Sequence, residues 1–270
     1  MNDAVLSPSL LPTISFALLA FALAAEAVGL IRTRGSADAV SPYLLGAAAV
    51  LLLADIVRRS LIIRFVAVTG LFESLVFFSA FVCVVVLVYR ILARQKALGL
   101  VVFGGTIAAV LLLALASSPL APKEILPPVP ALRSHWLVLH VTFSFVGESF
   151  FVVALVTSVL FLAGRDRERR DRLDRLTYLA TAIGYPVFSV GALVFGAIWA
   201  DVAWGSYWSW DPKEIWALVT WLTYTVYLHT RLVPKWRGVV SSVVSIVGFV
   251  FTLFTLFGVN FLIAGLHSYR

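Results

Sequence analysis

Apolar stretches of about twenty residues recur along the whole chain, and they constrain its fold more than any other feature. A helix of that length crosses a bilayer core of roughly 30 Å. In lipid, backbone polar groups must satisfy one another, and a helix does this within a single segment. The composition agrees, because 61% of the 270 residues are hydrophobic. The sequence therefore predicts an all-α polytopic membrane protein.

We expect about eight transmembrane helices, and they cover residues 11–31, 40–57, 70–92, 98–119, 136–163, 176–198, 214–230 and 238–258. No basic residues precede the first run, so it is interpreted as a span and not as a cleaved signal peptide. The single cysteine, Cys83, lies inside an apolar run and is expected to be a small buried hydrophobe. One cysteine excludes an internal disulfide and a cysteine-based metal site.

Positive charge predicts the orientation of these spans. The formal net charge is +7, and 14 of the 21 Lys and Arg residues fall at one set of short connections. Lys and Arg stay preferentially on the cytoplasmic side, so the charge is expected to set sidedness and not to bind nucleic acid. The longer connections, 58–69, 120–135, 199–213 and the tail 259–270, then face outward with both termini. Arg58, Arg59 and Arg64 oppose this pattern, and they indicate either an interfacial helix or a misplaced span boundary.

Two connections have a distinctive composition. Residues 164–175 carry dense charge of both signs, which is typical of a solvated helical connector, with a docking surface for a cytoplasmic partner as the alternative. Residues 117–130 contain five prolines and are expected to form an extended outer loop.

Six of the eight tryptophans lie within residues 199–221, in the run W-A-D-V-A-W-G-S-Y-W-S-W-D-P-K-E-I-W-A-L-V-T-W. Membrane proteins gather aromatic residues at both interfaces, but such a belt is spread over many helix ends. Asp211 is well placed to cap the next helix, with Pro212 at its first position. A cluster of indole rings suits a flat aromatic macrocycle, and the candidate binding residues are Trp199, Trp204, Trp208, Trp210, Asp211, Lys213 and Trp216.

Spacing sorts the four histidines into two groups. His140, about one turn into the fifth span, and His267, in the tail, are both expected at the outer face with the tryptophans. His229 lies 17 residues after Pro212, about 25 Å along a helix, and so near the cytoplasmic side. This suggests an outer iron site with a histidine pair and an inner site with one ligand from this chain. His135 is interpreted as an outer-loop residue and not as a ligand.

The tryptophan run resembles the WWD signature of haem-handling proteins in cytochrome c biogenesis. The form W-G-S-Y-W-S-W-D-P-K-E, followed by W-A-L-V-T-W and Y-L-H-T-R, is similar to the CcsA (ResC-like) family of System II cytochrome c synthetases. CcmC and CcmF share the W-G-x-Y-W-x-W-D core but differ after the aspartate. The sequences S-H-W-L-V-L-H-V and G-L-H-S-Y also look like this family. The resemblance covers residues 70–270, so we expect a haem-handling domain there with its WWD loop at 199–216, preceded by two helices and an interfacial segment in 1–69.

The resemblance implies that His140 and His267 ligate haem b beside the WWD loop, and that His229 receives haem earlier on its path. The protein would lie in the bacterial inner membrane or an equivalent membrane. A CcsB-type membrane partner would supply the second ligand to the inner haem iron. Haem would then be attached through its vinyl groups to the CxxCH thiols of apocytochrome c. Catalysis by such a haem lyase would be mainly positioning, because the substrate supplies the nucleophile.

Other polar residues and other functions remain open. Lys213 and Arg133 are candidate partners for the haem propionates. Glu26, Asp55, Glu73 and Glu148 lie in or near spans, where polar contacts between helices are the simplest interpretation. The alternative function is a CcmC-type transporter that delivers haem without forming the bond. A b-type electron carrier would need two facing histidines within the bilayer, and this chain offers one.

Overall fold

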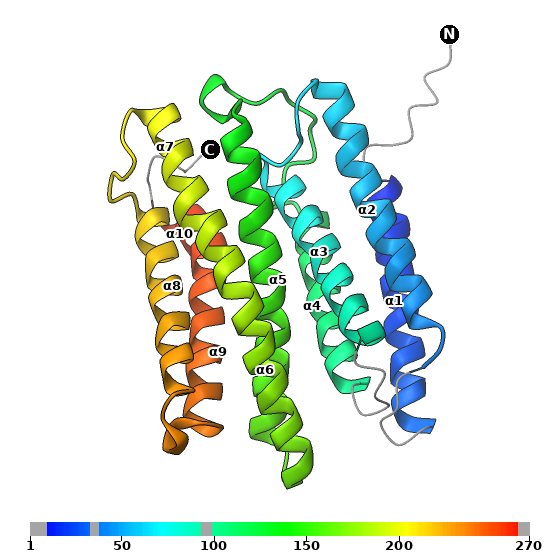
Figure 1. Cartoon of the computed structure of the whole chain (residues 1–270). Helices are drawn as coiled ribbons and strands as arrows, with labels where there is room; N and C mark the ends of the chain where they lie inside the picture. The colour runs from blue at the N-terminus through cyan, green and yellow to red at the C-terminus, as the bar shows by residue number, and fades with distance from the viewer. Residues whose placement is uncertain (1–9, 33–37, 93–98, 264–270) are drawn as a thin grey trace. The chain divides into compact units, whose positions relative to one another are not determined.

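The computed structural model describes residues 10–32, 38–92 and 99–263, and the regular structure in these ranges is entirely helical (Figure 1). Six of the helices are long and apolar enough to cross a membrane. The chain is therefore a polytopic membrane protein, as predicted. Contacts divide it into two units, residues 1–133 and 134–270. The domain boundary near residue 69 was drawn from motifs and not from contacts, and it stays a prediction.

The first unit is a ring of four helices, α1 (Leu10–Arg32), α2 (Ser41–Ile63), α3 (Leu71–Leu92) and α4 (Gly99–Ser117). Each helix packs on the next, and α4 closes the ring against α1. Cys83 on α3 is fully buried, which confirms its expected role. Thr106 donates to Glu26 across α4 and α1 at 3.0 Å, so this intramembrane carboxylate makes a contact between helices.

Helix α2 is longer than predicted, and its charges explain why. It continues to Ile63, so Arg58 and Arg59 lie on the helix itself and the span boundary at 57 was wrong. The Arg59 side chain is fully buried, 3.1 Å from Asp55 and 2.7 Å from Glu73. Arg58 also pairs with Asp55, at 2.8 Å. Two carboxylates balance two guanidinium groups, which lets the helix extend through a charged segment.

The second unit is also built from four rods. Two of them are single helices, α5 (His135–Ala163) and α8 (Pro212–Thr230). The other two are continuous rods of three segments each: α6 (Arg167–Phe188), η3 (Ser189–Phe195) and α7 (Gly196–Trp204) form one, and α9 (Val239–Leu253), η5 (Phe254–Gly258) and α10 (Val259–Leu262) form the other. Both η3 and η5 are π-helical segments. Helix α5 packs against α6 and α9, and α8 packs against the same two helices. Counting each continuous rod once, the described ranges contain the eight expected rods.

Close helix contact in this unit depends on two glycines. A Cβ on Gly184 would lie 2.8 Å from the Gly147 carbonyl oxygen, and a Cβ on Gly147 would lie 2.9 Å from the Gly184 oxygen. Any larger side chain would push α5 and α6 apart.

The connections match the predictions in type. Residues 122–129 have no regular structure, as expected for the proline-rich loop, and lead into the short 3₁₀ turn η2 (Pro130–Leu132). The charged connector becomes the start of α6, where Asp166 caps the helix by accepting from the Arg169 N–H at 2.8 Å. A second 3₁₀ turn, η4 (Pro234–Trp236), follows α8.

Candidate functional site

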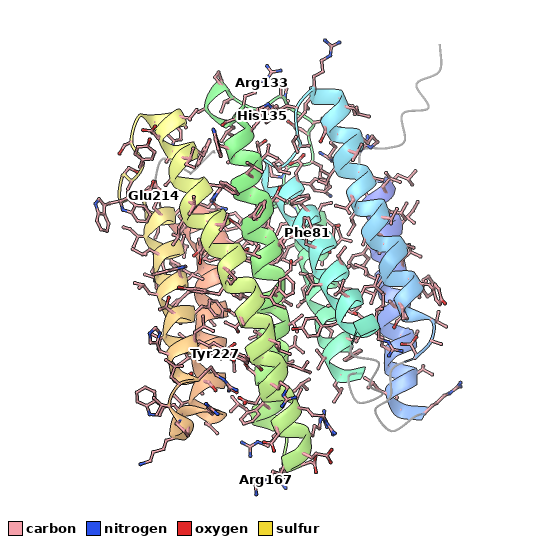
Figure 2. The ribbon with its side chains drawn as sticks, in the orientation of Figure 1. Phe81, Arg133, His135, Arg167, Glu214 and Tyr227 are labelled. Carbon is pink, nitrogen blue, oxygen red and sulfur yellow. The ribbon has the colours of Figure 1, made fainter. Side chains whose placement is uncertain are left out.

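The predicted site residues of the second unit lie at two opposite ends of its helices. Figure 2 shows His135 and Glu214 at the upper end, where α5 and α8 begin, and Arg167 and Tyr227 toward the lower end. His140 and the tryptophan loop belong to the upper end, and His229 belongs to the lower end. His267 lies outside the described residues, so its pairing with His140 stays a prediction.

His140 is held in one orientation by two contacts. Its Nδ1 lies 3.0 Å from the Gly191 carbonyl oxygen, and its ring stacks on Trp199 with centroids 6.0 Å apart and planes 12° apart. A carbonyl oxygen can only accept, so Nδ1 carries the proton. In the neutral ring the lone pair is then at Nε2, and this nitrogen is the one that can ligate a metal.

The carbonyl that orients His140 comes from the π-helical segment η3. Gly191 lies so close to α5 that a Cβ there would collide with the backbone N of Ser144. A Cβ on Gly196 would in turn lie 3.0 Å from His140 Nδ1. The glycines of η3 and α7 thus let the backbone itself approach the histidine.

Trp199 and Trp204 extend this arrangement along α7. Trp199 is 2% exposed, and its ring meets Trp204 edge to face with centroids 6.0 Å apart. The indole N–H groups of Trp204 and Trp208 are buried and find no acceptor among the described residues. A buried donor without an acceptor is costly, so both N–H groups are suited to donate to a ligand.

The loop that carries Trp208 and Trp210 is shorter than expected and spans residues 205–211. It leaves α7 at Gly205, whose φ of 75° ends the helix in the left-handed region. Trp208 and Trp210 meet edge to face at 5.7 Å, and Trp210 is 68% exposed with a φ of 59°. Positive φ is strained for a bulky residue, so neighbouring contacts must hold it in place.

Glu214 supplies those contacts. Its carboxylate accepts from the Ser209 N–H at 2.8 Å and from the Asp211 N–H at 3.2 Å. Asp211 Oδ1 accepts from the Lys213 N–H at 2.9 Å, and the two acids form a capping box on α8. The predicted capping role of Asp211 is confirmed. Glu214 was missed as a site residue, although its position three residues after the cap is the sequence signal for this motif.

Two tryptophans of the run pack between helices. Trp216 contacts Phe251 and Phe254, with centroids 5.6 Å and 4.3 Å away. Trp221 stacks on Tyr185 and donates to Ser189 Oγ at 2.8 Å. The described contacts of both residues attach α8 to the neighbouring rods.

Lys213 points inward, and its Nζ donates to Asn260 Oδ1 on α10 at 3.1 Å. Glu148 on α5 is 7% exposed and interacts electrostatically with this ammonium group. Glu148 lies two helical turns below His140 on α5, and Oε2 of this carboxylate has no hydrogen-bond donor among the described residues. The proximity of Lys213 to Glu148 was not predicted, and the proposed contact of Lys213 with a propionate stays a prediction.

His229 is exposed near the lower end of α8, and its Nδ1 lies 2.8 Å from the Thr225 carbonyl oxygen. The carbonyl fixes the same tautomer as in His140, with the lone pair at Nε2. His135 is exposed at the start of α5. Arg133 is exposed and belongs to the first unit.

The chain is similar in sequence to proteins of cytochrome c assembly. Residues 68–267 match the family described as "Cytochrome C assembly protein". A CcsA cytochrome c biogenesis protein of Prochlorococcus marinus (strain MIT 9303) is 34% identical, with 96% of this chain and 93% of that protein covered. A CcsA protein of Heterosigma akashiwo is 36% identical over 76% of this chain and 77% of its own length. The Chlamydomonas reinhardtii CcsA protein is 41% identical over 57% of this chain, and this match spans 46% of its own length.

Among solved structures, the fold is similar to the cytochrome c haem lyase CcmF, with a TM-score of 0.71 and 18% sequence identity. The match covers 95% of this chain and 48% of the CcmF chain. At this identity the likeness is one of fold.

Proposed function

We propose that this chain, which belongs to the cytochrome c assembly protein family, is the haem-binding subunit of a cytochrome c synthetase. Its similarity to CcsA proteins places it in the CcsA group of that family. It acts in cytochrome c maturation as an integral membrane protein. The proposed substrates are haem b and the CxxCH segment of apocytochrome c, and the proposed product carries thioether bonds between them.

One observation carries this proposal. The Gly191 carbonyl accepts from Nδ1 of His140 and so fixes its tautomer, and the ring stacks on Trp199 of α7, the helix that leads into the tryptophan loop. A metal-binding histidine whose second nitrogen donates to a carbonyl is the arrangement found at haem and zinc sites. The buried indole N–H groups of Trp204 and Trp208 add donors at the same end of the unit, so these residues fit a flat, iron-containing macrocycle.

In this proposal the side chains position the substrate and do not react with it. Nε2 of His140, with His267 from the tail, holds the iron, and the indole rings fix the plane of the macrocycle. The vinyl groups supply the reactive carbons, and the apocytochrome supplies the thiols. Glu214 keeps the loop in its strained shape, so that the bound ring meets a prearranged surface. Positioning of this kind lowers the activation free energy of a bimolecular reaction by several kcal/mol, roughly 7 to 11 kcal/mol in the best cases.

His229 is proposed as the inner ligand on the path that haem follows to the outer face. A single histidine leaves one axial position of the iron open, and a CcsB-type membrane partner is proposed to fill it. By the distribution of Lys and Arg, the end that carries His229 faces the cytoplasm, and the tryptophan loop faces outward across a bacterial inner membrane or an equivalent one.

The test is the visible absorption spectrum of the chain, co-expressed with its partner and purified in detergent. We expect a reduced b-type spectrum that weakens in His140→Ala and returns when imidazole is added, because imidazole replaces the missing ligand. His135→Ala is the matched control, since this exposed histidine is not a proposed ligand, and its spectrum should equal that of the wild type.

Adding apocytochrome to the loaded complex then separates two functions. Covalent attachment supports the synthetase, whereas release of haem without attachment supports a CcmC-type chaperone. A wild-type complex that carries no haem under haem-replete conditions would overturn the central claim.

A further inference from the structure

A hollow of about 330 Å³ lies at the lower end of the second unit, where α6 meets the end of α8 and the turn after it. It is lined by Tyr178, Arg231, Leu232 and Arg237. No residue of this hollow was predicted as a site residue. Its composition, two guanidinium groups beside an aromatic and an aliphatic side chain, is that of a site for an anionic group attached to an apolar body.

Both arginines are fixed in position before any ligand binds. Arg231 donates through Nη1 to Asp174 on α6 at 2.6 Å, and its guanidinium lies 5.3 Å from the centre of the Tyr178 ring. Arg237 donates through Nε to the Arg231 carbonyl oxygen at 2.8 Å. Each guanidinium group has five N–H donors, so each keeps further donors for a ligand. Little conformational entropy would be lost when an anion binds, because the side chains are already ordered.

The charge of the hollow is positive. Asp174 offsets Arg231, but no carboxylate in the described ranges forms an ion pair with Arg237. A bound carboxylate or phosphate would complete the balance, and a pair of guanidinium groups matches the two oxygens of a carboxylate.

The hollow is next to His229. The Leu232 N–H donates to the His229 carbonyl oxygen at 3.0 Å, so the lining residue Leu232 follows the histidine within one turn of chain. Leu232 and His229 are both exposed, as is Tyr178 on the facing helix. A ligand with a metal at one point and carboxylates at its edge would engage the histidine and the arginines together.

We propose that Arg231 and Arg237 bind the propionate carboxylates of haem while His229 holds its iron. This rests on the proposed function, since it assumes that His229 receives haem. Haem at this site is then oriented, with its propionates at the inner hollow and its vinyl edge directed away from it. The apocytochrome thiols react with the vinyl groups. In this orientation the vinyl edge of the haem would already point toward the outer face, where that reaction is proposed to occur.

The test measures haem affinity at the inner site alone. The full chain is purified with its partner in a His140→Ala background, which removes the proposed outer site, and is titrated with haem and with haem dimethyl ester. Esterification removes the negative charge of the propionates and keeps the iron and the ring. We expect Arg237→Gln to weaken haem binding about ten-fold, and the double variant Arg231→Gln/Arg237→Gln to weaken it further. The affinity for the ester should stay unchanged in both variants.

Lys235→Gln is the matched control, because this exposed lysine lies in the same turn, loses the same charge and does not line the hollow. It should retain wild-type affinity for both ligands. An equal loss of haem and ester affinity in Arg237→Gln would mean that the arginine only supports the fold, and the proposal would fail. If Lys235→Gln and Arg237→Gln lose the same amount of haem affinity, the effect is a general attraction between charges. That result would also overturn the proposal.

Two further outcomes are distinguishable. If Arg237→Gln releases a bound anionic lipid, detected by native mass spectrometry, and leaves haem affinity intact, the hollow is a lipid phosphate site and the proposal is wrong. The His229→Ala variant reports on the proposed function itself. If this variant binds haem as well as its parent, there is no inner haem site, and that result removes the premise as well as the inference.

Discussion

His140 depends on a backbone atom as much as on its own side chain. The Gly191 carbonyl fixes its tautomer, and the carbonyl is in reach only because Gly191 has no Cβ to separate η3 from α5. Outer hydrogen bonds of this kind commonly change metal affinity by about 10- to 100-fold. The site therefore has a sensitive position that is not itself a ligand.

We predict that Gly191→Ala lowers both stability and haem retention. The added methyl group would collide with the Ser144 backbone, so η3 must move away from α5 at a cost of about 1 to 3 kcal/mol. The shift also lengthens the His140 hydrogen bond, and haem retention by the purified complex should fall about ten-fold. Thermal unfolding in detergent and the b-type absorbance measure the two effects.

Gly46→Ala on α2 is the control for this prediction. A Cβ there would meet Leu87 at 3.6 Å, an ordinary contact, and alanine favours a helix over glycine by up to about 1 kcal/mol. We expect unchanged haem and equal or higher stability. Retained haem in Gly191→Ala, together with a lowered melting temperature, would show that the carbonyl does not position the histidine.

At the residue scale, the sequence predicts where the site side chains lie better than it predicts which groups they contact. The position of His140 one turn into α5 follows from counting, and so does the place of His229 at the end of α8. The partner of His140 is a backbone carbonyl 51 residues away, in a π-helical segment, and no residue type encodes this. The same holds for Lys213, whose contact with Asn260 depends on how α10 ends.

Three rods of the second unit meet around the Lys213 side chain. Lys213 begins α8, Glu148 lies on α5 and Asn260 lies on α10. The Lys213 ammonium group donates to Asn260 and interacts electrostatically with Glu148, and both contacts offset the cost of removing its charge from water. Lys213 therefore couples the three rods energetically.

We predict that Lys213→Met destabilises the protein by about 2 kcal/mol, because the charged hydrogen bond to Asn260 and the attraction to Glu148 are lost. Glu148→Gln should destabilise it through the loss of the same attraction, and the double variant should cost clearly less than the two single changes together. Unfolding in detergent measures all three. Lys235→Met, at an exposed lysine, should change stability by less than about 0.5 kcal/mol. Additive effects of Lys213→Met and Glu148→Gln would contradict the coupling.

Glu214 organises the loop between α7 and α8, and its removal should loosen that loop. We predict that Glu214→Ala costs about 1 kcal/mol in stability, as expected for a lost capping box, and lowers haem retention more than this cost explains. Limited proteolysis should show faster cleavage within residues 205–211. Glu168→Ala is the control, because exposed Glu168 forms a surface ion pair with Arg172 at the start of α6, and its loss should have little effect. Intact haem retention in Glu214→Ala would assign Glu214 a capping role alone.

Elements were predictable where their ends are marked by turn residues and not where tertiary contacts set them. Pro212 and Asp211 mark the start of α8 correctly, and Ser134 caps α5 just before the predicted start. The end of α2 was wrong because Arg58 and Arg59 suggested an interface, whereas Glu73 from another helix neutralises the buried Arg59. Ion pairs between helices are invisible to a scan of local hydrophobicity.

At the scale of the whole molecule, eight transmembrane helices were predicted from apolar length, which is a strong local signal. The described ranges contain eight helical rods, and six of them are long and apolar enough to cross a membrane. The division into two units after Arg133 was not predicted, because it depends on which helices pack together. Sidedness is a further global property. The concentration of Lys and Arg at one set of connections predicts that the tryptophan loop and the hollow lined by Arg231 and Arg237 lie on opposite sides of the membrane.

We predict that single cysteines at the two ends of α8 are labelled from opposite sides. Ser206 and Lys235 are exposed in the loops before and after α8, and the natural Cys83 is fully buried, so the parent chain should remain unlabelled. A membrane-impermeant maleimide added to intact cells should label Ser206→Cys and not Lys235→Cys, and inverted vesicles should give the reverse. Labelling of both from one side would mean that α8 does not cross the membrane. Reversed labelling would place the tryptophan loop in the cytoplasm, and haem would then have to move inward to reach it, which the proposed attachment to an outer apocytochrome does not allow.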